Sequence, residues 1–142
     1  MRFWDASAIV PLVCREPLSR RSRILYRQDP TLVVWTLTPT EVLCALSRKR
    51  RDGVLTQDVF RGARRRLDLL IRDWMEVYDV DAAKVRAHRL LETHPLRATD
   101  ALQLAAALVA ALDRPGGFEF VTFDEILASA AEREGLSVLG LD

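Results

Sequence analysis

Four acidic residues stand where this sequence passes from an apolar run into a helical pattern. Asp5 and Asp124 each lie just past a short apolar run, Glu41 lies one helical turn past another, and Asp100 lies near the start of an alanine-rich segment. Carboxylates held close together repel one another, and hard divalent cations with oxygen ligands relieve the repulsion. The pattern predicts one site for Mg²⁺ or Mn²⁺, with one or two ions that activate water for in-line attack on a phosphodiester.

Helix capping is an alternative explanation for three of these acids. Asp5 is a favoured residue type for the N-cap of a following helix. The segments 38–41 and 122–125 both match a capping box, in which a threonine caps the helix and a glutamate follows three residues later. In the second box Asp124 would be an acid of the first helical turn. Each explanation is reasonable alone, so the metal site depends on the joint pattern.

Asp100 has an unusual place in the periodicity of its segment. Residues four apart share one face of a helix, which puts Asp100 on a stripe with Leu104 and Leu108, with Leu112 beyond. A carboxylate on an apolar stripe is costly unless it is paired or binds a metal. The alternative is an acid in the first turn that interacts with the helix dipole.

Apolar runs alternate with helical patterns along the whole chain. This alternation predicts a three-layer α/β protein with a parallel sheet, in which ligands bind beyond the carboxyl ends of the strands. We expect strands at residues 2–4, 32–35, 75–80, 118–121 and 137–141, and helices from about residue 7 and at 17–28, 38–52, 56–73, 81–92 (capped by Asp81), 98–112 and 123–134.

Bulk properties favour one globular domain over residues 1–142. No apolar stretch is long enough for a membrane helix, and the start does not match a signal peptide, so a cytoplasmic protein is expected. Cys14, Cys44, His88 and His94 lack the close spacing of a zinc site, which favours two core thiols and two surface imidazoles. Trp4 and Trp35 are expected in the core rather than as platforms for RNA bases.

Arginine dominates the basic residues and occurs in clusters. The net charge is only +1, but all basic residues except Lys49 and Lys84 are arginine. Arginine matches phosphate geometry, although such runs are also common on solvated helix faces. The clusters lie at 20–27, 48–51 and 61–66, and the candidates for contact with an RNA backbone are Arg48, Arg51, Arg64 and Arg65.

The ordered set of motifs resembles the PIN-domain nucleases, in particular VapC-like toxins of bacterial toxin–antitoxin pairs. The resemblance covers essentially the whole chain, and each motif is short. It rests on residues 5–8 (Asp-Ala-Ser-Ala), 38–42 (Thr-Pro-Thr-Glu-Val), 98–105 (Ala-Thr-Asp-Ala-Leu-Gln-Leu-Ala) and 121–124 (Val-Thr-Phe-Asp).

The resemblance implies a strand order of 3-2-1-4-5 and Mg²⁺- or Mn²⁺-dependent cleavage of single-stranded or loop RNA, leaving a 5′-phosphate and a 3′-hydroxyl. It implies that Asp5, Glu41 and Asp100 form the centre of the site, that Asp124 is a more variable fourth acid, and that the hydroxyls of Ser7 and Thr122 line it. It also implies a homodimer, neutralised by a small antitoxin protein.

Two alternatives come from other classes of protein. A receiver-type signalling domain also places acids at strand ends, but it needs a lysine after a late strand, and neither Lys49 nor Lys84 is in such a place. A PIN-like RNA-binding module without catalysis is the other. The complete set of four acids argues against it without excluding it.

Overall fold

The computed structural model describes residues 1–141, and its five strands form one parallel sheet. The strands are β1 (Arg2–Trp4), β2 (Leu32–Trp35), β3 (Met75–Val77), β4 (Glu119–Val121) and β5 (Ser137–Leu139). Their order in the sheet is β3-β2-β1-β4-β5, and each neighbouring pair is parallel. The predicted fold class and strand order are therefore confirmed.

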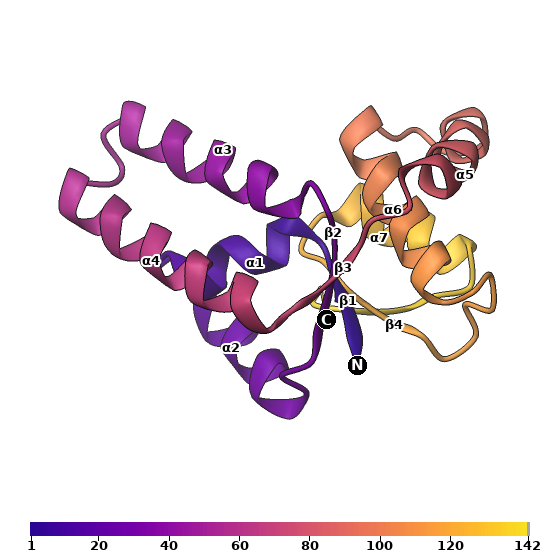
Figure 1. Ribbon diagram of the computed structural model, residues 1–142, viewed down its shortest axis with the longest axis horizontal. Helices are drawn as coiled ribbons and strands as arrows, with labels where there is room; N and C mark the ends of the chain where they lie inside the picture. Colours follow the sequence, from indigo (N-terminus) through magenta and orange to yellow (C-terminus); the bar gives the residue numbers. More distant parts are fainter. Residues whose placement is uncertain (142) are drawn as a thin grey trace.

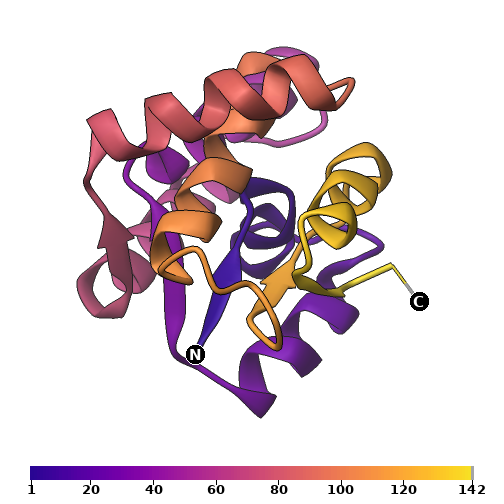
Figure 2. The same cartoon turned by 90° about the vertical axis from the view of Figure 1, so that its right-hand side faces the viewer.

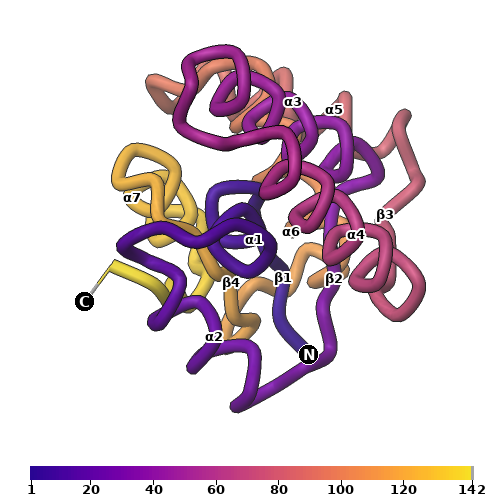
Figure 3. Tube along the Cα trace, turned by 90° about the vertical axis from the view of Figure 1, so that its left-hand side faces the viewer, coloured from indigo at the N-terminus to yellow at the C-terminus, as the bar shows by residue number. Residues whose placement is uncertain are grey.

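Seven helices cover the two faces of this sheet within the described residues. They are α1 (Ala6–Val13), α2 (Ser19–Gln28), α3 (Thr38–Arg51), α4 (Gln57–Asp73), α5 (Val80–Thr93), α6 (Ala98–Ala110) and α7 (Glu125–Arg133). The first four lie on one side of the sheet and the last three on the other (Figure 1). Views from the two sides show α5, α6 and α7 together (Figure 2) and α1 to α4 together (Figure 3).

Alternation along the strands divides the core into two parts. Successive side chains of a strand point to opposite faces, so Phe3 packs with α5, α6 and α7, whereas Trp4 packs with α1, α3 and α4. Phe3 also stacks on Phe120 of the neighbouring β4, with ring centroids 5.5 Å apart. Trp4 and Trp35 are both fully buried, which confirms their prediction as core residues. None of the helices in residues 1–141 has the length and apolar character needed to span a membrane.

Several predicted element boundaries were wrong by a few residues. β3 ends at Val77 rather than at residue 80, because Asp79 caps α5 by accepting a hydrogen bond from the Ala82 amide at 2.9 Å. Asp81, the predicted cap, lies in the first turn instead. α6 ends at Ala110, and Leu112 leaves the apolar stripe with a φ of 53° and 80% exposure.

Two predictions about thiols and imidazoles were also wrong. Cys14 is buried as expected, but Cys44 is exposed. α3 packs through Val42 and Leu46, and Cys44 lies midway between them on the outward face of the helix. His94 is only 6% exposed rather than on the surface, since its ring nitrogen Nε2 lies 2.7 Å from a Glu134 carboxylate oxygen.

Gly140 lies where the chain passes close to the end of β4, and we expect substitution there to be strongly destabilising. Its φ is 126°, and a Cβ atom would lie 2.3 Å from the Thr122 carbonyl oxygen. Gly140→Ala should lower the free energy of unfolding by roughly 3 kcal/mol, from backbone strain and overpacking together. Gly53→Ala is the control in chemical denaturation: its φ is 75° but the space is open, so it should cost only about 1 kcal/mol. Equal costs for the two variants would contradict this account.

Candidate active site

The four acids all lie at the start of helices. Asp5 is the N-cap of α1 and Asp124 the N-cap of α7, whereas Glu41 and Asp100 lie in the first turns of α3 and α6. β1 pairs with β4 through Trp4 and Val121, so Asp5 and Thr122 leave the sheet side by side. This is the carboxyl edge of a parallel sheet, where the sequence predicted the chemistry to be.

Asp5 is 4% exposed and held by three hydrogen bonds to one oxygen. Its Oδ2 accepts from the Ser7 amide at 3.2 Å, the Ser7 hydroxyl at 2.5 Å and the Thr122 hydroxyl at 3.0 Å. Among the described residues, none donates to Oδ1, which leaves that oxygen for another ligand. Asp5 can therefore cap α1 and also bind a metal ion, because the cap uses only Oδ2.

Thr122 connects Asp5 to Asp124 instead of capping α7. Its hydroxyl donates to Asp5 and accepts a hydrogen bond from the Asp124 amide at 3.1 Å. Asp124 itself is the cap, and its Oδ1 accepts from the Leu127 amide at 2.8 Å. The predicted capping box with Thr122 as cap is thus wrong, because the threonine hydroxyl is already engaged across the sheet edge.

Asp100 and Asp124 line one hollow, which we call the acidic hollow, of about 340 Å³. Arg97, Thr99, Pro95 and Ile126 complete its lining. Burial raises the pKa of Asp100, and the charge of Asp124 raises it further, whereas the charge of Arg97 lowers it. Asp100 is therefore in the first turn of its helix and also faces another carboxylate.

Glu41 is supported by a buried pair of polar residues to which the sequence analysis gave no role. Gln103, fully buried on α6, donates from Nε2 to the Thr38 hydroxyl at 3.1 Å, and its amide also lowers the pKa of Glu41 against the larger effect of burial. Thr38 is the first residue of α3, and the N-cap is Leu37, so the predicted capping box with Thr38 as cap is wrong. The signal was a glutamine on an otherwise alanine- and leucine-rich helix, three residues after Asp100 and on the same face.

The electrostatics of the carboxylates indicate a site that lacks a counter-charge. Burial raises the pKa of Glu41 to about 7, and the charges of Asp5 and Asp100 contribute to the rise. Burial also raises the pKa of Asp5, against the lowering effect of Ser7 and Thr122, and the charge of Asp100 adds to the increase. A divalent cation would favour the charged forms, and carboxylate oxygens are suitable hard ligands for Mg²⁺ or Mn²⁺.

The donor set therefore fits such an ion in its chemistry, although the side chains are not in a ready ligand arrangement. Within residues 1–141, no group of three or more His, Cys, Asp or Glu side chains is arranged to hold a metal ion. Mutual repulsion of uncompensated carboxylates favours such a separation. The acids are nevertheless close enough to raise one another's pKa values, and small rotations of their side chains would change the ligand geometry without moving the helices that carry them.

The predicted arginine contacts lie away from these acids. Arg48 and Arg51 are exposed at the far end of α3, about 10–15 Å along the helix from Glu41. Arg64 and Arg65 are exposed on α4, and Arg64 forms an ion pair with Asp68. Arg97 is the arginine that lines the acidic hollow, and the sequence analysis did not single it out.

The fold and this edge together define an α/β protein that presents acidic residues where parallel sheets bind their ligands. The chain belongs to the PIN domain family, whose model matches residues 2–136. PIN domains are generally nucleases and typically use divalent metal ions. The receiver-domain alternative is thereby excluded.

Two solved structures have a similar fold. The crystal structure of PAE2754 from Pyrobaculum aerophilum is 20% identical, with 96% of this chain and 87% of that chain covered and a TM-score of 0.67. The crystal structure of FitAcB from Neisseria gonorrhoeae is 13% identical, with 98% and 96% covered and a TM-score of 0.66. At these identities the likeness concerns the fold alone. No curated protein matches the chain significantly.

Proposed function

We propose that this protein is a Mg²⁺- or Mn²⁺-dependent endoribonuclease that hydrolyses phosphodiester bonds in single-stranded or loop RNA. The observation that carries the proposal is the gathering of four carboxylates, three of which have raised pKa values with charge repulsion among the causes. Asp124 contributes its charge to Asp100. Family membership supports the nuclease chemistry.

The role that we propose for each residue follows from its surroundings. Asp5, through Oδ1, and Asp100 would hold the ion, Asp124 would complete its ligands, and Ser7 and Thr122 would orient Asp5. A bound divalent ion lowers the pKa of water and stabilises charge on the phosphate and leaving oxygen. Glu41, with a pKa of about 7 before metal binds, is suited to orient the attacking water or to accept its proton.

The biological role that we propose is that of the toxin in a toxin–antitoxin pair, following the resemblance to VapC-like proteins. A small antitoxin would neutralise the enzyme by placing an arginine against the carboxylates, which form charge-assisted hydrogen bonds with guanidinium groups. We also propose one domain over residues 1–142, a homodimer and a cytoplasmic location.

The proposed activity is tested with the purified protein and end-labelled RNA containing loops, such as tRNA, ribosomal RNA and mRNA fragments. Internal cleavage should need Mn²⁺ or Mg²⁺, stop with EDTA and leave 5′-phosphate ends. Binding of RNA without cleavage under all metal conditions would contradict the proposal and favour a non-catalytic RNA-binding module.

Removing the Thr122 hydroxyl should weaken metal binding. Thr122→Val deletes the donor to Asp5 Oδ2 and the acceptor of the Asp124 amide with little change in volume. We expect Mn²⁺ affinity, measured by calorimetry, to fall about 10- to 100-fold, as is typical when a group that orients a ligand is lost. Thr93→Val is the control, because that hydroxyl bonds only the Arg89 carbonyl on α5. Equal affinities of the two variants would show that Thr122 does not position the ligands.

A further inference from the structure

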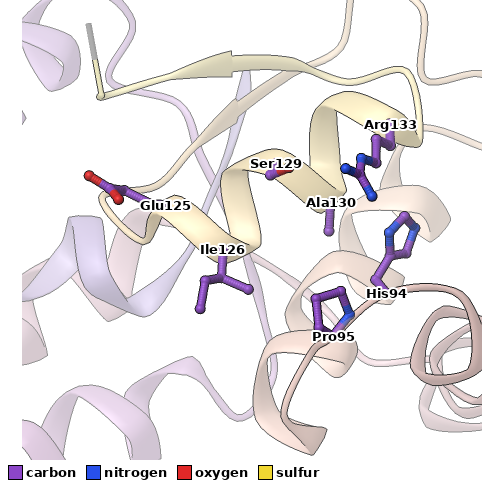
Figure 4. A pocket seen from close by; sticks show the side chains of 7 residues that line it. All are labelled: His94, Pro95, Glu125, Ile126, Ser129, Ala130 and Arg133. Atoms are coloured by element: carbon purple, nitrogen blue, oxygen red, sulfur yellow. The ribbon is translucent and has the colours of Figure 1, made fainter.

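A second hollow, which we call the α7 hollow, lies between α7 and the turn at Pro95 (Figure 4). It measures about 230 Å³, and its lining includes Ser129 and Arg133. Pro95 and Ile126 line both hollows, so the two are adjacent. The smaller volume lies below the roughly 300–1,000 Å³ of typical drug-sized ligand sites, and it suits a small, flat group.

A free guanidinium stands at the far end of this hollow. Arg133 is exposed and forms no ion pair or hydrogen bond with any other residue from 1 to 141. Glu125, the acid of the same lining, lies at the opposite end of α7 in Figure 4. Arg133 follows Asp124 by nine residues, or about 13 Å along the helix. Its guanidinium is too far away to contact a phosphate at the carboxylates, but it could contact a phosphate further along the same nucleic acid strand.

A network of polar contacts holds the wall opposite α7 in place. His94 Nε2 lies 2.7 Å from Glu134 Oε1, and Arg89 donates to both oxygens of Glu134 at 3.1 and 2.8 Å. These contacts attach the turn at Pro95 to the end of α7. The hollow is therefore formed before a ligand arrives, which lowers the cost of binding.

We propose that the α7 hollow binds the nucleotides of a single-stranded RNA that follow or precede the bond at the carboxylates. A base would pack on the apolar surfaces of Pro95 and Ile126, and Arg133 would bind a backbone phosphate. The position next to the acidic hollow and the unpaired positive charge of Arg133 both favour a polyanionic nucleic acid strand as the occupant. The inference rests on the proposed function only in taking RNA as the substrate.

Binding can be measured separately from cutting. We would use Asp100→Asn protein with a short fluorescein-labelled single-stranded RNA of mixed sequence, in EDTA, and follow fluorescence anisotropy against salt. Adding Arg133→Ala should weaken binding about three- to tenfold and reduce the salt slope by about 0.7. Ser129→Trp, at an exposed position of the lining, should weaken binding by filling the hollow. Arg114→Ala is the control, since Arg114 is an exposed arginine just past the end of α6 and lines neither hollow.

The possible outcomes separate this proposal from the proposed function. If the wild type cleaves RNA but Arg133→Ala and Ser129→Trp bind like Arg114→Ala, the α7 hollow is not a nucleotide site and the nuclease assignment stands. If binding depends on Arg133 and Ser129 but no metal supports cleavage, the site stands and the nuclease assignment fails.

Discussion

Asp5→Asn and Asp100→Asn should each reduce RNA cleavage by roughly a thousandfold while the protein stays folded. Asparagine keeps the size of the side chain and still caps a helix, but it removes the negative charge that would bind the ion. Loss of several kcal/mol of transition-state stabilisation corresponds to about this factor in rate. Single-turnover cleavage of labelled RNA in saturating Mn²⁺ measures the effect, and thermal unfolding checks the fold.

Asp79→Asn is the matched control for these variants. Asp79 caps α5 through the Ala82 amide, as Asp5 caps α1 through the Ser7 amide, but it lines neither hollow. It should cut RNA at the wild-type rate. If Asp5→Asn cuts as fast as Asp79→Asn, Asp5 is only a cap and the proposed centre is wrong.

Substitutions of the four acids should reduce RNA cleavage to different extents. Asp124→Asn should have a smaller effect than Asp5→Asn, because Oδ1 of Asp124 is already used by the Leu127 amide. Glu41→Gln should fall between them if Glu41 orients water. An equal effect at all four positions would indicate a role in holding the fold rather than separate chemical roles.

The sequence predicted the sheet and the acids because both depend on local pattern. Alternation of apolar runs and helical segments is sufficient to indicate a parallel sheet, and a parallel sheet brings the ends of its strands to one edge. Capping and metal binding looked like competing explanations of Asp5. The two explanations do not compete, because Asp5 uses only one of its two carboxylate oxygens, Oδ2, for the cap.

What the sequence could not predict depends on contacts between distant residues. The pairing of Gln103 with Thr38 joins residues 65 positions apart, and that of His94 with Glu134 joins residues 40 apart. Neither pair has a characteristic spacing. The same limit applies to Arg133, whose place in the lining of the α7 hollow follows from the packing of α7 against the turn at Pro95.

Metal-free protein should lose stability as the pH rises from about 4.5 to 7. The pKa of Glu41 is about 7 in the folded protein, against 4.5 without perturbation. The folded state therefore binds this proton more tightly than the unfolded state, so protonation stabilises the fold and deprotonation removes that stability. Allowing for solvent screening at a partly exposed group, the loss amounts to about 2 kcal/mol. Urea unfolding in EDTA across this pH range measures it.

Glu41→Gln decides whether this pH dependence and the binding of metal have one origin. The neutral amide removes the titration, so the variant should be more stable than the wild type above pH 7 in EDTA and should respond less to pH. Mn²⁺ should stabilise the wild type most above pH 7, where Glu41 is charged, and should stabilise the variant less, because a ligand that binds only the folded state shifts unfolding by mass action. Glu92→Gln on the exposed surface of α5 should leave both behaviours unchanged. If Glu41→Gln matched Glu92→Gln in both respects, the repulsion at the sheet edge would not involve Glu41, and the site would have to be built on the three aspartates alone.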